Sequence, residues 1–123
     1  MELIEAPAFT RSLYACPDEE QYRALQNELM KNPEAGDVMP GTGGFRKMRR
    51  ADPERGKGRR GGLRIIYYYF STDQQIWLMM LYGKNEAADL SAAEKKALKA
   101  AVDRETAVRA ERRAAGSRRP GRK

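Results

Sequence analysis

Histidine is absent from this chain of 123 residues, and Cys16 is its single cysteine. One cysteine cannot form an internal disulfide, and without histidine no zinc or iron cluster is expected. The absence of histidine also removes the side chain that most often exchanges protons near neutral pH. Any acid–base chemistry must therefore come from Lys, Tyr, Glu or Asp, with arginine as a stabiliser of negative charge. We expect neither a metal nor a cofactor.

Long apolar runs are also missing. No stretch approaches the roughly 20 residues that cross a bilayer. The N-terminus carries Glu2 and Glu5 where a secretory signal would place basic residues before an apolar stretch. The sequence therefore predicts a cytoplasmic protein that has no contact with a membrane.

Basic residues are abundant and unevenly spread. Residues 1–45 hold 3 basic and 8 acidic residues, a net charge of −5. Residues 46–64 hold 9 basic and 2 acidic residues, a net charge of +7, and residues 104–123 hold 8 and 2, a net charge of +6. Such segregation indicates a polyanionic partner, above all a nucleic acid contacted through its phosphates.

Periodicity and capping signals divide the chain into short strands and helices. Strands are expected over residues 2–6, 45–50, 63–70 and 75–82, and helices from Thr10, over 18–32 and from Ser91. This order predicts an α+β fold, a small antiparallel sheet of about four strands with N-terminal helices and a C-terminal helix packed on it. We expect a domain over 1–102, a helical extension over 103–115 and a disordered basic tail over 116–123.

Strand alternation assigns side chains to faces of the two clearest strands. One face of residues 63–70 should carry Arg64, Ile66, Tyr68 and Phe70. One face of the next strand should carry Ile76, Leu78, Met80, Tyr82 and, beyond its end, Lys84. In an antiparallel hairpin Arg64 and Lys84 then lie near the same edge of the sheet.

The most basic stretch, Gly41 to Tyr69, has the composition of a phosphate-binding surface. Its central loop, residues 51–62, carries basic side chains between glycines: Arg55, Lys57, Arg59 and Arg60. These four are expected to bind RNA. The alternative is a solvated, flexible hairpin loop with no ligand.

Four motifs follow one another along the chain: GTGGFRKMR, GKGRRGGLRIIYYY, IWLMMLYGKNEAADLS and AEKKAL. With these motifs in this order, residues 1–102 resemble the RelE/ParE toxin superfamily, and most of all the HigB-like branch of type II toxin–antitoxin systems. The resemblance implies the RelE-like microbial RNase fold. It also implies a toxin that cleaves messenger RNA on the ribosome without a metal and so inhibits translation. Its partners would be the ribosome, mRNA and a cognate DNA-binding antitoxin encoded by an adjacent gene.

The resemblance also implies a set of site residues. The catalytic candidates are Lys47, Arg49, Arg64 and Lys84, and Arg46 is an additional RNA-binding candidate. The residue types suit cleavage by the neighbouring 2′-hydroxyl, because arginine clamps phosphate oxygens and a lysine crowded by cations can act as a base. We assign Lys47 as the base, Arg49 and Arg64 as phosphate stabilisers, and Lys84 as an acid or stabiliser.

Tyr68 and Tyr82 are candidates for base stacking or proton transfer, and the alternative is that both pack in the sheet. Residues 91–123 contain no aromatic side chain, so the chain lacks the C-terminal tyrosine of some family members. The charge of the basic tail is compatible with three roles, which are binding the ribosome, binding the antitoxin and keeping the protein in solution.

Two further functions stay open. The first is a ParE-like inhibitor of DNA gyrase, which shares the fold but has no nuclease activity. The second is an RNA-binding module without catalysis, for which the segregated charge would suffice.

Overall fold

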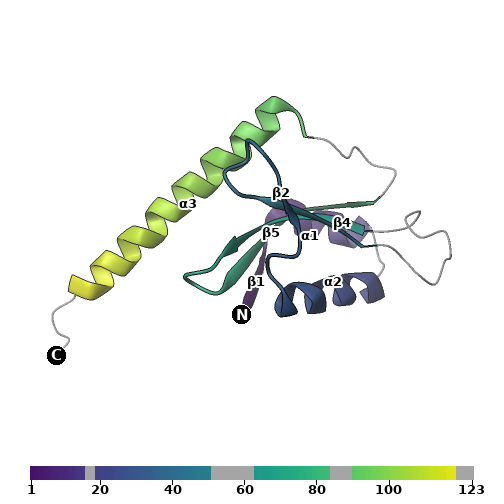
Figure 1. Ribbon diagram of the computed structural model, residues 1–123, viewed down its shortest axis with the longest axis horizontal. Helices are drawn as coiled ribbons and strands as arrows, with labels where there is room; N and C mark the ends of the chain where they lie inside the picture. Colours follow the sequence, from purple (N-terminus) through teal and green to yellow (C-terminus); the bar gives the residue numbers. More distant parts are fainter. Residues whose placement is uncertain (16–18, 51–62, 84–89, 119–123) are drawn as a thin grey trace.

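The computed structural model describes residues 1–15, 19–50, 63–83 and 90–118. A single five-stranded sheet lies between two N-terminal helices and one long C-terminal helix (Figure 1). In chain order the elements are β1 Glu2–Glu5, α1 Pro7–Ala15, α2 Glu19–Lys31, β2 Asp37–Val38, β3 Arg46–Arg50, β4 Leu63–Phe70, β5 Gln75–Gly83 and α3 Ala92–Arg118. The predicted α+β class is confirmed. None of the described helices has both the length and the apolar composition of a membrane span.

The sheet differs from the expected one in two respects. Its strand order is β1-β5-β4-β3-β2, so it has one strand more than predicted. It is mixed, because β1 pairs with β5 in parallel while the other pairs are antiparallel. The additional strand, β2, has two residues and is too short to show a period of two. The parallel direction of β1 reflects its pairing with β5, a strand far away in the sequence, which local sequence does not encode.

Each face of the sheet carries its own apolar core. On one face Phe9 from α1 and Leu25 and Leu29 from α2 pack on residues of the central strands, including Ile65 and Tyr67. These two leucines form the buried stripe of α2. On the other face α3 contributes Leu98 and Val102, which join the cluster that holds Phe45, Ile66, Phe70 and Tyr82. The basic ends of β3 and β4 are thereby fixed to a rigid two-sided scaffold.

A bulge in β5 changes which side chains share a face. Met80 pairs with Ile66 and Leu78 pairs with Tyr67, so Met79 is an extra residue at the register shift. Ile76 and Leu78 therefore join the core under α1 and α2, whereas Met80 and Tyr82 lie on the α3 side. The prediction that these four residues share one face is wrong. The run QIWLMMLY is apolar throughout, so no polar residue marks the position of the bulge.

The glycines before β3 form a packing turn. Gly41, Gly43 and Gly44 have positive φ values of 80°, 79° and 118°. A Cβ on Gly43 would lie 3.1 Å from Cγ1 of Val102, so this glycine lets the turn approach α3 closely. The buried Thr42 closes the turn, since its hydroxyl donates to the Met39 carbonyl at 2.7 Å and accepts the Phe45 N–H at 3.1 Å. Gly43 therefore packs against α3, a role that the phosphate-binding interpretation of this stretch did not include.

Helix α3 begins with the predicted capping box. The Glu94 N–H donates to the Ser91 hydroxyl at 3.1 Å, and the Ser91 N–H donates to the Glu94 carboxylate at 2.8 Å. The helix then continues without a break through residues 103–115 and ends at Arg118, so it includes the first three residues of the stretch expected to be a disordered tail. The division of the chain at residues 102 and 103 stays a prediction.

Candidate functional site

Three neighbouring strands bring basic side chains into one row. Arg49 on β3 lies directly opposite Arg64 on β4, and Arg64 lies directly opposite Tyr82 on β5. Directly opposed residues of an antiparallel pair have Cβ atoms roughly 4.5–5.5 Å apart. Two guanidinium groups and a phenol are therefore neighbours, although the three residues are far apart in the sequence.

Lys47 extends this row along the same face. It lies two residues before Arg49 on β3 and opposite Ile66 on β4, so its side chain points to the same side as those of Arg49 and Arg64. Ile66 belongs to the core on the α3 side of the sheet. The sequence-based grouping of Lys47, Arg49 and Arg64 at one place is thus consistent with the strand register.

A cleft of about 450 Å³ adjoins these side chains. Its lining consists of Glu28, Ala35, Gly36, Asp37, Lys47, Met48, Arg49 and Arg64. The cleft is not purely basic, because Asp37 on β2 lies directly opposite Lys47. It brings three basic residues and two carboxylates together, and it extends to the α2 side of the sheet, because Glu28 on α2 and Met48 of the core under α1 and α2 also line it.

Arg64 is the cation of this row that has a buried nitrogen atom. Its side chain is half-buried, and within the described part of the chain its Nη1 atom is buried without a hydrogen-bond partner. A buried donor without a partner costs roughly 1–3 kcal/mol, and more when it is charged. Such a group is rare in folded proteins, and a catalytic role, a bound ion or a water molecule can account for it.

Tyr67 and Arg46 hold one wall of the cleft in place. The Tyr67 hydroxyl accepts the Gly36 N–H at 2.8 Å and donates to the Pro33 carbonyl at 2.8 Å. Nη1 of Arg46 donates to the carbonyls of Glu34 at 3.1 Å and Gly36 at 2.8 Å. Arg46, predicted to bind RNA, therefore fixes residues 34–36 behind the cleft.

Tyr67 shapes the site, although it was not among the residues predicted from the sequence. Burial raises the pKa of Tyr67 above its usual value of 10.0, so its hydroxyl stays protonated and keeps its hydrogen bond to Pro33. Gly36 fits only because it has no side chain, since a Cβ there would lie 2.9 Å from the Lys47 carbonyl oxygen and 3.0 Å from the Tyr67 ring. The sequence signal for this role was weak, since it consisted only of a tyrosine on the inward face of a predicted strand.

The two tyrosines predicted to stack on bases lie mainly in the sheet. Tyr82 is 8% exposed and belongs to the core beneath α3. Tyr68 is half-buried, and its ring centre lies 5.4 Å from that of Phe45 and 4.6 Å from that of Phe70. This is the packing role that the sequence left open as the alternative. Stacking on an RNA base stays a prediction for both tyrosines. Tyr68 is the better placed of the two, because part of its side chain is exposed.

Several predicted site residues fall outside the described residues. These are the catalytic candidate Lys84 and the RNA-binding candidates Arg55, Lys57, Arg59 and Arg60. Within residues 1–15, 19–50, 63–83 and 90–118, no group of three His, Cys, Asp or Glu side chains is placed to hold a metal ion.

Comparisons with known proteins give similarity to solved structures but no family. No family model matches the chain. Among solved structures, the chain is similar to a chain in the crystal structure of an archaeal RelE–RelB complex from Pyrococcus horikoshii OT3. The sequence identity is 22%, the match covers 70% of this chain and 97% of that chain, and the TM-score is 0.46.

Proposed function

We propose that this chain is the toxin of a type II toxin–antitoxin system, an endoribonuclease of the HigB-like kind that cleaves mRNA on the ribosome without a metal. The observation that carries the proposal is the row of Arg49 and Arg64 beside Lys47, in which a guanidinium nitrogen of Arg64 is buried and lacks a partner in the described chain. Arg64 also lines the adjoining cleft, where a phosphate would pair with its guanidinium group.

The proposed reaction uses the 2′-hydroxyl next to the scissile phosphate. Its oxygen forms a bond to phosphorus while the bond from phosphorus to the 5′-oxygen breaks, leaving a 2′,3′-cyclic phosphate and a 5′-hydroxyl. Lys47 takes the proton from the 2′-hydroxyl, and Lys84 returns a proton to the leaving oxygen. Arg49 and Arg64 stabilise the extra negative charge of the pentacoordinate phosphorus. Cations fixed in advance by a sheet suit this task because they need little rearrangement during the reaction.

The partners are part of the same proposal. The ribosome presents the mRNA strand to the cleft, and a DNA-binding antitoxin encoded by an adjacent gene holds the protein inactive in the cytoplasm. Arg55, Lys57, Arg59, Arg60 and Lys84, which lie outside the described residues, are proposed to contact the RNA backbone. Tyr68 is proposed to stack on a base.

A primer-extension assay tests the proposal. Purified protein is mixed with ribosomes that carry a defined mRNA, and cleavage is mapped with and without ribosomes. We expect cuts only with ribosomes, and a loss of about 100-fold or more in rate for Arg64→Ala, because one charge-stabilising group is worth about that much. Arg104→Ala is the matched control, since Arg104 is an exposed arginine on α3 and does not line the cleft.

The other functions predict different results in the same samples. Intact mRNA together with blocked supercoiling by gyrase would favour the ParE-like inhibitor. Intact mRNA with RNA binding that weakens in Arg64→Ala would favour a binding module. Cleavage that is unchanged in the Lys47→Ala, Arg49→Ala and Arg64→Ala variants would contradict the proposed site.

A further inference from the structure

A second hollow of about 610 Å³ lies at the opposite end of the central strands from the cleft. We call it the arginine groove, and its lining consists of Ile4, Asp73, Gln75, Trp77, Glu105, Arg109, Arg112 and Arg113. It shares none of these residues with the lining of the cleft. The groove is formed where the C-terminal half of α3 passes beside β1 and the start of β5.

The floor of the arginine groove is apolar. Ile4 on β1 and Trp77 on β5 are directly paired in the sheet, so their side chains lie together on one face. Both are half-buried. Trp77 is supported from the side by Phe70 and Phe45, whose ring centres lie 5.7 Å and 6.4 Å away. This gives a firm aromatic surface that remains partly open to a ligand.

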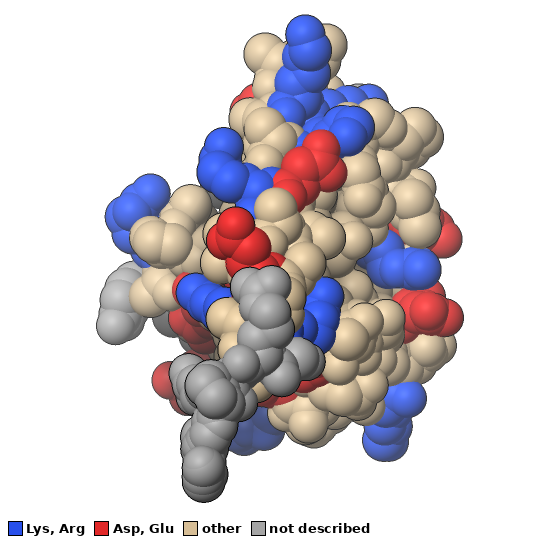
Figure 2. All heavy atoms as spheres, turned by 90° about the vertical axis from the view of Figure 1, so that its left-hand side faces the viewer, with Lys and Arg blue, Asp and Glu red and all other residues tan. Residues whose placement is uncertain are grey.

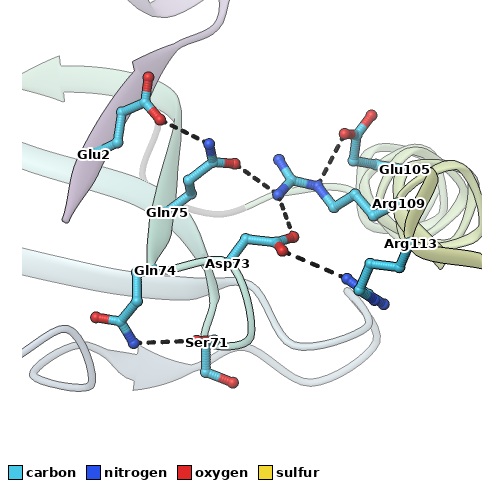
Figure 3. A network of polar contacts seen from close by, with 8 residues as sticks. All are labelled: Glu2, Ser71, Asp73, Gln74, Gln75, Glu105, Arg109 and Arg113. Atoms are coloured by element: carbon cyan, nitrogen blue, oxygen red, sulfur yellow. Dashed lines mark hydrogen bonds and ion pairs between the residues drawn. The ribbon is translucent and has the colours of Figure 1, made fainter. Parts of the chain in front are cut away.

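Arg109 forms a rigid part of the wall (Figure 3). Its guanidinium group contacts Asp73 at 2.7 Å, Glu105 at 2.9 Å and Gln75 at 2.6 Å. Its Cζ atom also lies 3.8 Å from the centre of the Phe70 ring. With 13% of its side chain exposed and two carboxylates beside it, Arg109 is neutralised and holds α3 to the turn before β5.

The next two arginines are more available. Arg113 is 49% exposed, and its contact with Asp73 is long at 3.5 Å. Arg112 is exposed and forms no ion pair with the described residues. Two guanidinium groups therefore border the apolar floor without a strong intramolecular partner.

The surrounding charge favours a protein segment over a nucleic acid. Asp73 and Glu105 line the groove, and Glu2 reaches its edge through a 2.7 Å hydrogen bond from Gln75. Figure 2, which faces the C-terminal end of α3, shows basic and acidic side chains interspersed on this side. A nucleic acid carries a negative charge on every phosphate, so it would be repelled by these carboxylates however it is aligned in the groove. A peptide can instead place its few acidic side chains at the arginines alone.

We propose that the arginine groove binds a segment of a partner protein that carries both apolar and acidic side chains. The apolar side chains cover Trp77 and Ile4, and the carboxylates pair with Arg112 and Arg113. Because the groove and the cleft share no lining residue, such a partner binds without filling the cleft. The proposal holds whether or not the cleft cleaves RNA.

Trp77 provides the test, because it is the only tryptophan in the sequence. The full-length protein is titrated with a synthetic amphipathic peptide that has Leu and Glu at helical spacing, and the emission of Trp77 is followed. We expect a saturable shift, and a loss of affinity of about tenfold when Arg112 and Arg113 are both replaced by Glu. Arg104→Glu, an exposed substitution on α3 outside the groove, should change the affinity less than twofold.

Four results would overturn the proposal. They are no shift with the peptide, equal affinity in the Arg112→Glu/Arg113→Glu variant, a stronger Trp77 response to oligouridine RNA, and a shift that follows protein concentration alone and so indicates a second copy. Circular dichroism checks that each variant is folded. The milder pair Arg112→Gln and Arg113→Gln repeats the test without reversing the charge, and should weaken binding by a smaller factor.

Discussion

Arg49 and Arg64 lie directly opposite each other on β3 and β4, so two like charges occupy one cross-strand pair. Such a pair destabilises an isolated sheet, and an opposite-charge or apolar pair in its place would contribute roughly 0.2–1 kcal/mol. The fold therefore gives up stability at this position, which is typical of residues kept for a ligand.

The first prediction concerns this pair. Arg49→Thr should raise the free energy of unfolding by about 0.2–1 kcal/mol, because it removes the repulsion and introduces a residue that favours strands. The gain should shrink in high salt, which screens exposed charges. Urea unfolding at low and high salt measures both effects.

Lys47→Thr is the matched control for Arg49→Thr. Lys47 lies on the same strand and face, but its cross-strand neighbours are Asp37 and Ile66, so its removal relieves no like-charge pair. We expect no gain in stability from it. A loss of stability in Arg49→Thr would show that the two arginines do not repel each other in the folded protein.

The second prediction concerns the wall of the cleft. Tyr67→Phe removes the hydroxyl that accepts the Gly36 N–H and donates to the Pro33 carbonyl, and it leaves a buried N–H without a partner. The free energy of unfolding should fall by about 1–3 kcal/mol. Tyr69→Phe is the control, because that hydroxyl accepts one exposed 3.3 Å hydrogen bond from Gln74, and its loss should cost less than about 0.5 kcal/mol. Equal losses in the two variants would contradict the assigned role of Tyr67.

Sequence patterns predicted the elements that local chemistry determines. The strand expected over residues 63–70 has the bounds of β4, and the capping box at Ser91 and Glu94 begins α3. β-branched and aromatic residues favour a strand wherever they lie together, and a capping box satisfies backbone donors next to it in the chain. Neither depends on the rest of the fold.

The features that were missed depend on contacts between distant segments. The parallel pairing of β1, the bulge at Met79 and the hydrogen bonds of Arg46 all involve partners far away in the sequence. The same limit applies to the site. The sequence shows that Lys47, Arg49 and Arg64 are basic, but only the strand register sets Arg49 against Arg64. Nothing in the sequence indicates that the side chain of Arg46, one residue before Lys47, donates hydrogen bonds to backbone carbonyl groups.

The third prediction concerns alkaline pH. Tyr22 has a pKa above its usual value of 10.0 because it is buried and because its hydroxyl donates to the Glu5 carboxylate at 2.7 Å. Burial likewise raises the pKa of Tyr67. In the unfolded chain both tyrosines lose their protons near pH 10, whereas in the folded chain they keep them to higher pH. Their contribution to stability is therefore complete below pH 10 and is lost as the pH rises above it.

Urea unfolding between pH 8 and pH 11 measures this effect. The wild-type protein should lose stability above about pH 10, and the loss should be smaller in Tyr22→Phe because one linked proton is gone. Tyr69→Phe serves as the comparison, because the Tyr69 hydroxyl accepts an exposed 3.3 Å hydrogen bond from Gln74, and it should follow the wild type. A stability that stays level up to pH 11 would contradict the prediction.

The last prediction concerns how the turn before β3 holds α3. Gly43→Ala introduces a Cβ at a φ of 79° and 3.1 Å from Cγ1 of Val102, so it strains the backbone and pushes against the helix. We expect it to lower the free energy of unfolding by about 1–3 kcal/mol and to increase hydrogen exchange around Leu98 and Val102. Gly116→Ala is the matched control. Gly116 lies within α3 with nothing within 4 Å of an added Cβ, so alanine there should stabilise the helix by roughly 0.5–1 kcal/mol. The same substitution should therefore have opposite signs at the two positions, because Gly43 has a positive φ and a close neighbour, whereas Gly116 is helical with open space around it. If Gly43→Ala left exchange in α3 unchanged, the turn would not be what fixes this helix to the sheet.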